Sequence, residues 1–139
     1  MSKTQFELVG DFHRKFELPA FPGRRLQMIE GRVFDFRFAF LKEELDELLA
    51  AQCRQDLPGI ADALADLVYV ALGTAHYYGI PFDAVFAEVH RANMEKVRAA
   101  SDDDPRSKRN TKLDVVKPDG WRPPDILKAL VREKWTDKI

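Results

Sequence analysis

Cysteine is nearly absent from this sequence, whose 139 residues include only Cys53. A single cysteine excludes an internal disulfide and cannot by itself build a thiolate metal site. Long apolar runs are absent too, because the longest one, LVYVAL at 67–72, is far shorter than a bilayer-spanning segment. The N-terminal stretch MSKTQFELVG contains no apolar signal core. We therefore expect a soluble, cytoplasmic protein that does not bind membranes.

An excess of charge of one sign is also absent. The chain has 22 Lys and Arg against 23 Asp and Glu, a formal net charge of −1, so no basic field favours a nucleic-acid partner. Hydrophobic residues at 45% and charged residues at 32% exclude disordered and fibrous classes. This length suits one domain, and we expect a single domain over 1–139, with a helical core at about 4–99 and a charged linker and proline-rich tail at 100–139.

Apolar residues recur at helical spacing in four segments, at 4–16, 31–52, 60–78 and 83–99. Gly79 is a C-terminal cap signal for the third helix, and Asp83 is a candidate N-cap for the fourth. Pro58 is expected near the first turn of the third helix. No run alternates long enough to predict a strand. The sequence therefore predicts an all-α bundle built on four helices.

The C-terminal part is expected to be less regular. The segment SDDDPRSKRNTK at 101–112 is polar and charged, which predicts a mobile linker. The segment KPDGWRPPD at 117–125 is a proline-rich turn. Asp125 is a candidate cap for a short last helix reaching to about Trp135.

Four carboxylates crowd into residues 43–47 of the second helix, and only Lys42 lies nearby to offset them. Like charges three or four residues apart on a helix repel one another. On a helical wheel, Glu44 and Glu47 flank an apolar stripe that is expected to face the core. The stripe consists of Phe34, Phe38, Leu41, Leu45, Leu48 and Leu49. Taken alone, the acidic run is equally compatible with a solvated face.

The third helix favours a buried role for acidic groups. Asp62 and Asp66 share one face of a helix that is otherwise mostly apolar, and such a helix is normally buried. An unpaired carboxylate inside the bundle is unfavourable, so a cation must face it. A lysine or arginine would serve, but two acidic helices facing each other favour Mg²⁺ or Mn²⁺ between them. Gly73, on the same face, either leaves room for a ligand or packs against another helix.

The fourth helix places two polar groups within its apolar stripe, Asn93 and Lys96. A lysine near a helix end often extends its ammonium to solvent, and a core amide can be satisfied by its neighbours. Beside a metal–carboxylate cluster, however, both residues are candidates to bind phosphate oxygens.

Taken together, these motifs resemble those of a known superfamily. EELDE at 43–47 matches the EExxE signature of the MazG-like all-α nucleoside triphosphate pyrophosphohydrolases. DALADLVYV at 62–70 is similar to their second acidic helix, and VHRANMEKV at 89–97 is similar to the helix with an NxxK element. The superfamily includes dimeric dUTPases, dCTP pyrophosphatases and phosphoribosyl-ATP pyrophosphohydrolase. The resemblance covers roughly 6–99, and the 117–125 segment looks like the tail of phage and bacterial members.

The resemblance implies that Glu44, Glu47 and Asp66 are metal ligands. The second motif of the family is ExxD, but the residue three before Asp66 is Ala63 in this chain. Asp62 stands four before and keeps the same helix face, so it replaces the glutamate directly, binds through water or supports the other ligands.

The resemblance further implies a Mg²⁺-dependent hydrolase, with Mn²⁺ able to replace Mg²⁺. It would cleave a (deoxy)nucleoside triphosphate between the α and β phosphates to give the monophosphate and pyrophosphate. Glu43 is the candidate general base because Glu47 fits better as a ligand, and Asn93 and Lys96 would hold the phosphates. A homodimer or homotetramer is also implied. The alternatives are phosphoribosyl-ATP as substrate, a non-catalytic nucleotide-binding or adaptor protein, and a purely structural acidic patch.

Overall fold

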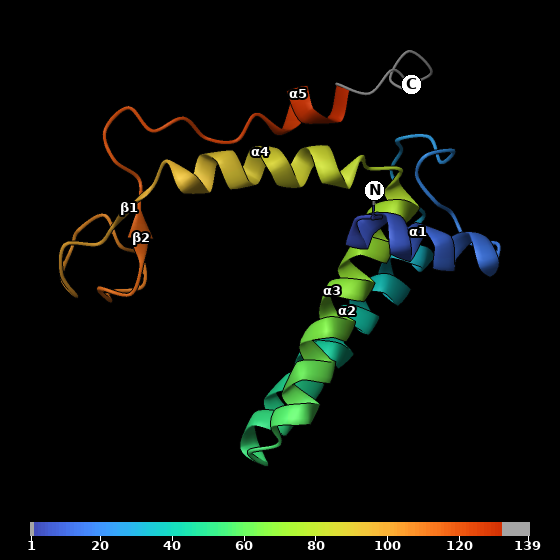
Figure 1. Ribbon diagram of the computed structural model, residues 1–139, viewed down its shortest axis with the longest axis horizontal. Helices are drawn as coiled ribbons and strands as arrows, with labels where there is room; N and C mark the ends of the chain where they lie inside the picture. The colour runs from blue at the N-terminus through green and yellow to red at the C-terminus, as the bar shows by residue number, and fades with distance from the viewer. Residues whose placement is uncertain (1, 132–139) are drawn as a thin grey trace. The chain divides into compact units, whose positions relative to one another are not determined.

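A computed structural model describes residues 2–131 of the chain. Its elements are α1 (Gln5–Lys15), α2 (Gly31–Cys53), α3 (Leu57–Tyr78), α4 (Phe82–Met94), β1 (Val97–Arg98), β2 (Val115–Val116) and α5 (Ile126–Val131) (Figure 1). The described chain is mostly helical with very little strand, so the predicted all-α class is confirmed. It divides into two compact units, one ending at Asp83 and the other beginning at Ala84. The expectation of a single domain stays a prediction.

The helices of the first unit begin and end at sequence signals. Thr4 caps α1 through a capping box with Glu7, and Asp56 caps α3 by accepting the Gly59 N–H. Pro58 lies in the first turn of α3, as expected, and Gly79 ends that helix with a left-handed φ of 71°. The helix α3 packs against both α2 and α1, and α2 and α3 form a long antiparallel pair (Figure 1).

A small core joins α1 to the end of α3. It contains Phe6, Val9, Leu72 and Ala75, with Phe21, Ile80 and Phe82 packed against it. His76 is fully buried beside this core and stacks on the Phe6 ring. Its Nδ1 accepts the Phe21 N–H at 2.9 Å and its Nε2–H donates to the Phe6 carbonyl at 2.8 Å. Burial lowers the pKa of His76 to about 4, so the ring is neutral at physiological pH and fixes the loop before α2 to α1.

The apolar stripe of α2 does not form the core of the single chain. Phe38, Leu45 and Leu49 are 57%, 54% and 64% exposed, so the expectation that this stripe is buried was wrong for the described chain. The buried positions of α2 are instead Arg37, Glu44 and Ala51, which follow one another at intervals of seven residues. A helical wheel identifies an amphipathic face but not what covers it, and here the narrow seam toward α3 is partly polar.

Arg37 connects α2 to α3 by hydrogen bonds rather than by an ion pair. Its Nε donates to Thr74 Oγ1 at 3.2 Å and its Nη2 donates to the Val70 carbonyl at 2.9 Å. The guanidinium carbon lies 5.0 Å from the centre of the Tyr77 ring, a cation–π contact. No described carboxylate pairs with this guanidinium, and burial lowers the pKa of Arg37.

Gly73 makes this packing possible. A Cβ at this position would lie 2.7 Å from Arg37 Nη2 and 2.8 Å from His13 Nε2, closer than van der Waals contact allows. Of the two roles that the sequence left open for Gly73, the structure therefore supports helix packing.

The apolar character of α3 extends beyond its buried residues. By length and composition alone, α3 is long and apolar enough to cross a membrane. Only 22% of its most apolar 18-residue stretch is buried. Core helices of soluble proteins satisfy the same criterion, and α3 carries Asp62 and Asp66. The expectation of no membrane partner stays a prediction.

In the second unit, α4 is shorter than predicted. The helix ends at Met94 rather than near residue 99, and Asp83 lies in its first turn instead of preceding it. The Ala92 carbonyl accepts the Trp121 indole N–H at 2.7 Å and the Glu95 N–H at 3.3 Å, which closes the last turn. The chain then continues as β1, whose Val97 pairs with Val116 of the antiparallel strand β2. The sequence predicted neither strand.

The short last helix was predicted correctly at its start. The Asp125 carboxylate accepts the Lys128 N–H at 3.0 Å, so it caps α5. The predicted end near Trp135 lies outside the described residues.

Replacing Gly73 by alanine is expected to destabilise the protein by about 1–3 kcal/mol, because the added methyl group overpacks the α2–α3 seam. Gly31→Ala is the matched control, since nothing lies within 4 Å of the position that its added methyl group would occupy. Urea unfolding of both variants measures the difference. Equal stability of the two variants would contradict the packing role of Gly73.

Candidate metal centre

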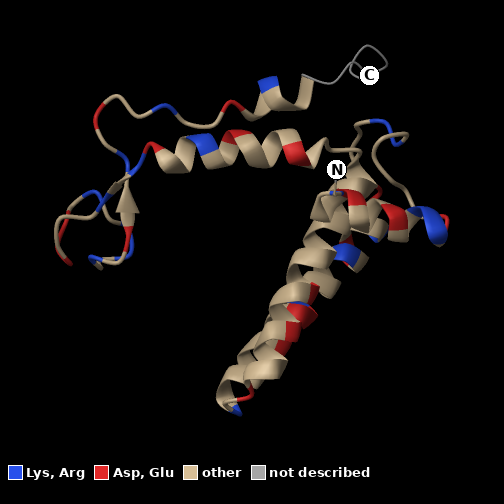
Figure 2. Ribbon diagram, viewed as in Figure 1, with Lys and Arg blue, Asp and Glu red and all other residues tan. Residues whose placement is uncertain are grey.

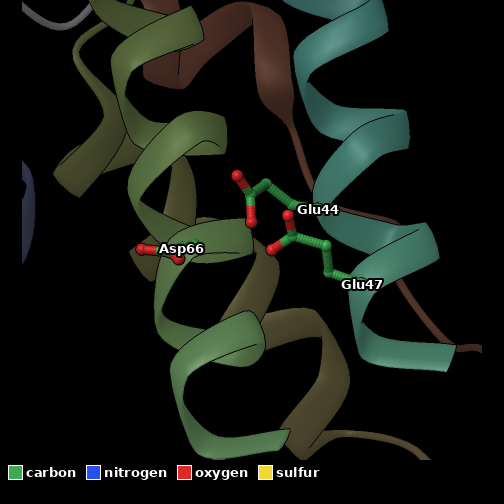
Figure 3. Close-up of side chains that lie close together, drawn as sticks. All are labelled: Glu44, Glu47 and Asp66. Carbon is green, nitrogen blue, oxygen red and sulfur yellow. The ribbon is translucent and has the colours of Figure 1, made fainter. Parts of the chain in front are cut away.

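Three carboxylates converge between α2 and α3. Glu44 and Glu47 project from α2, and Asp66 lies on α3 (Figure 3). One oxygen from each lies within 4.8 Å of the others. Among the described residues, this is the group of acidic, histidine and cysteine side chains whose spacing suits a metal ion.

The sequence produces this cluster through two simple periodicities. Glu44 and Glu47 are three residues apart, so they share one side of α2. Glu47 lies six residues before the end of α2, and Asp66 lies nine residues after the start of α3. The antiparallel pairing of the two helices therefore brings them close together (Figure 3).

Glu44 is the buried member of the cluster, with 7% of its surface exposed. Burial raises the pKa of Glu44, and the charges of Glu47 and Asp66 raise it further. Its Oε2 is buried without a hydrogen-bond partner, and no other side-chain oxygen or nitrogen in the described residues has this property. A buried carboxylate oxygen without a donor is unfavourable, and a bound cation would relieve this cost. Three carboxylates offer the oxygen ligands that Mg²⁺ and Mn²⁺ prefer.

Two other predicted residues lie on the same helices but outside the cluster. Asp62 is exposed on α3, one turn before Asp66, and is not part of the three-residue group. Glu43 is exposed and lines a shallow cavity of about 550 Å³ on α2 together with Glu47 and Asp46. The roles of Asp62 as a ligand and of Glu43 as a base stay predictions.

The two predicted phosphate-binding residues belong to the second unit. Asn93 is exposed in the last turn of α4. The Lys96 ammonium lies 5.5 Å from the centre of the Trp121 ring. Their roles stay predictions as well.

Sequence reasoning missed Arg37, the buried cation on the same seam as Glu44. The available signal was its spacing, since Arg37, Glu44 and Ala51 are seven residues apart. A seven-residue interval returns to nearly the same side of a helix. Arg37 was therefore detectable once Glu44 was taken as a residue facing α3.

These features define an all-α protein with a carboxylate cluster that suits a divalent cation. Residues 9–93 match the family PRA-PH, phosphoribosyl-ATP pyrophosphohydrolase. The match covers more than half of the chain, and the chain belongs to this family. The family is part of the MazG-like all-α nucleoside triphosphate pyrophosphohydrolase superfamily, so the resemblance seen in the sequence motifs is confirmed.

The chain is also similar to an uncharacterized protein of Acanthamoeba polyphaga mimivirus. The two are 30% identical over 101 residues, which cover 68% of this chain. The chain spans 36% of the length of this viral relative, and the relative's name gives no activity.

Glu44 is expected to couple stability to magnesium. Its pKa is raised in the folded state, so ionised Glu44 destabilises the metal-free protein, and this effect disappears as the pH falls through the raised pKa. Glu44→Gln should therefore raise the melting temperature without metal at neutral pH. Magnesium should stabilise the wild type by about 2.7 kcal/mol at a hundredfold excess over Kd, and less at lower pH.

Differential scanning calorimetry with magnesium or a chelator measures both effects. Asp46→Asn is the matched control, because Asp46 lies in the same acidic run but outside the cluster. The control should keep the magnesium shift, and Glu44→Gln should lose it. A full magnesium shift in Glu44→Gln would show that the ion binds elsewhere.

Proposed function

We propose that this protein is a Mg²⁺-dependent nucleotide pyrophosphohydrolase, with Mn²⁺ able to replace Mg²⁺. The substrate class is a (deoxy)nucleoside triphosphate, cleaved between the α and β phosphates into the monophosphate and pyrophosphate. The observation that carries the proposal is the unpaired buried oxygen of Glu44 beside Glu47 and Asp66, in a chain of the PRA-PH family. A carboxylate buried in this way is unfavourable for the fold alone and useful for binding a cation.

Each acidic residue has a defined role in the proposal. Glu44, Glu47 and Asp66 hold the metal, and Asp62 assists directly or through water. When bound, the metal neutralises phosphate oxygens and acidifies a water molecule. Glu43 accepts a proton of the attacking water as the water oxygen bonds to phosphorus, the anhydride bond between the α and β phosphates breaks, and pyrophosphate leaves. Glu43 is exposed on the same helix as two of the ligands, so solvent and substrate reach it.

Asn93 and Lys96 hold the phosphate chain in this proposal. An amide donates hydrogen bonds to phosphate oxygens, and a lysine adds a point charge. The exposure of Asn93 and the absence of a described carboxylate partner for Lys96 leave both groups available.

Phosphoribosyl-ATP is the second candidate substrate, because the matched family is described by that activity. Its cleavage also breaks an α–β phosphate anhydride, so the same acidic cluster serves both substrates. A non-catalytic nucleotide-binding protein remains the alternative from another class, and it would bind nucleotide without releasing pyrophosphate.

We also propose that the protein is a homodimer or homotetramer. Apolar side chains are exposed along α2 and α3, the two helices that carry the cluster. They are Phe34, Phe38, Leu45, Leu49, Leu64 and Val68, with exposures between 43% and 64%. An exposed apolar surface that follows two adjacent helices is typical of an interface between subunits. A second copy of the chain is the proposed occupant because it would complete a helical bundle.

A panel of canonical, deoxy and modified nucleoside triphosphates and phosphoribosyl-ATP, with detection of pyrophosphate, tests the activity. Glu44→Ala, Glu47→Ala and Asp66→Ala should each lower kcat by about 100-fold or more, because each removes a metal ligand. Asp46→Asn should keep wild-type activity. Glu43→Gln should lower kcat while keeping the magnesium-induced rise in melting temperature.

Folded protein that binds nucleotides but releases no pyrophosphate from any of them would exclude the enzyme and favour the binding protein. Release of pyrophosphate from phosphoribosyl-ATP alone would show that phosphoribosyl-ATP, and not a nucleoside triphosphate, is the substrate.

Charging the apolar face of α2 tests the oligomer. Leu45→Asp combined with Leu49→Asp should convert the oligomer into monomers, because carboxylates cannot be buried against a second copy. Leu113→Asp is the matched control, since Leu113 is a 79% exposed leucine of the second unit. Sedimentation equilibrium measures the mass of each protein. A monomeric wild type at micromolar concentration would contradict the proposed assembly.

A further inference from the structure

The second unit contains a strongly basic cavity. Its volume is about 420 Å³, within the range of small-molecule sites. Five cationic side chains and one carboxylate line it, with Val115 and Val116 at the strand β2: Lys96, Arg106, Lys108, Arg109, Lys117 and Asp114. Figure 2 shows the cationic residues gathered around β1, β2 and the loops that join them. The chain as a whole has a net charge of −1, so this concentration of positive charge is local.

The two arginines of the cavity are neutralised by the protein. Arg106 Nη2 lies 2.9 Å from Asp104 Oδ2, and Arg109 Nη1 lies 2.9 Å from Asp114 Oδ1. Asp119 also acts on Arg106 electrostatically. These pairs leave the arginines oriented but without excess charge.

The three lysines of the cavity have no carboxylate partner within the described part of the chain. Lys96 and Lys117 place their ammonium groups 5.5 Å and 4.9 Å from the centre of the Trp121 ring. A cation–π contact holds an ammonium group in place but does not cancel its charge. Lys108 has neither kind of contact in the described residues. Three like charges around one cavity repel one another, and an anion would relieve the repulsion.

The loop between β1 and β2, which carries Lys108, is built around two buried aspartates. Asp104 accepts the Ala100 N–H at 2.8 Å and the Arg106 N–H at 3.0 Å. Asp114 accepts the Ser107 hydroxyl at 2.9 Å and the Val115 N–H at 3.0 Å.

The hydrogen bonds of these aspartates also determine which cations remain available. The Arg106 side chain lowers the pKa of Asp104, and the Ser107 hydroxyl lowers the pKa of Asp114, so both carboxylates are ionised and occupied. Neither is free to pair with a lysine. The segment expected to be a mobile linker is thus a hydrogen-bonded loop that leaves its lysines unpaired.

We propose that this cavity binds an oligophosphate group, supplied either by free pyrophosphate or by a nucleoside triphosphate. The clustered, uncompensated ammonium groups match a compact polyanion better than a single carboxylate, and an ammonium group is a suitable phosphate ligand. Lys96 belongs to the cavity, and the assignment adds Lys108 and Lys117 to it as phosphate-binding residues. The nucleotide source rests on the proposed function, whereas binding of free pyrophosphate does not.

Isothermal titration calorimetry of the full chain with inorganic pyrophosphate, in a chelator and at low salt, tests the cavity alone. Without metal the acidic cluster repels the ligand, so binding reports the basic site. We expect one pyrophosphate per chain and an affinity lowered about tenfold or more in Lys108→Gln combined with Lys117→Gln. Lys112→Gln is the matched control, because Lys112 lies in the same loop but does not line the cavity.

No binding to the wild type, or the same loss in the control, would overturn the proposal. Tighter binding of a single-stranded oligonucleotide than of pyrophosphate, with the same lysine dependence, would overturn it in favour of a nucleic-acid surface.

Kinetics separates the two sources. If the double variant has a raised KM for the triphosphate and an unchanged kcat, the ligand of the cavity is the triphosphate substrate. If only the inhibition constant for pyrophosphate is raised, the ligand is free pyrophosphate. If the wild type hydrolyses no nucleotide, and both the wild type and Glu44→Gln bind pyrophosphate without metal, the assignment of the cavity stands and the proposed function is wrong. If the wild type hydrolyses a nucleotide but does not bind pyrophosphate, the proposed function stands and the assignment of the cavity is wrong.

Discussion

Between the two long helices lies a buried carboxylate for which the described part of the chain supplies no cationic partner. Glu44 turns toward α3 and lies beside Glu47 of its own helix and Asp66 of α3 instead of beside a cation. Its pKa is raised by burial and by these neighbours, so the folded protein resists ionising the group that a metal requires. In the proposed metal site, affinity for a divalent ion and stability without the ion would therefore be opposed properties of this side chain. Proteins commonly accept such a local loss of stability where it serves a binding site.

The seam between α2 and α3 separates opposite charges along one helix. Arg37 and Glu44 occupy the same face of α2, about 10 Å apart along its axis. Arg37 is satisfied by a carbonyl, a hydroxyl and aromatic rings, whereas Oε2 of Glu44 has no hydrogen-bond partner. No described carboxylate pairs with Arg37, so its guanidinium does not neutralise the acidic cluster of Glu44, Glu47 and Asp66. The seam thus holds its structural polar group and its candidate functional group apart.

The acidic cluster and most helix boundaries follow from local rules, and these could be predicted from the sequence. Spacing alone placed Glu44 and Glu47 on one side of a helix, and Gly79 and Asp125 marked helix ends through their own backbone chemistry. The same rules placed Asp66 on the facing helix but did not reveal its distance from the glutamates. That distance depends on how the two helices pair.

Features that depend on distant residues could not be predicted. The α4 helix ends at Met94, and the indole of Trp121, far along the chain, donates to the Ala92 carbonyl in its last turn. The loop after β1 has a polar composition typical of mobile linkers, yet Asp104 and Asp114 fix it by binding backbone N–H groups. Composition does not record which side chain meets which amide. The exposed leucines of α2 show the same limit, since a wheel cannot say whether a stripe meets its own chain or another.

The close approach of Gly73 to Arg37 and His13 ties three positions on three helices to one another. A relative that carries a bulkier residue in place of the glycine must shorten at least one of the other two side chains to keep the helices at the same separation. Positions 13, 37 and 73 are thus expected to covary among relatives. The extent of this covariation would show how strictly the distance between the helices is preserved.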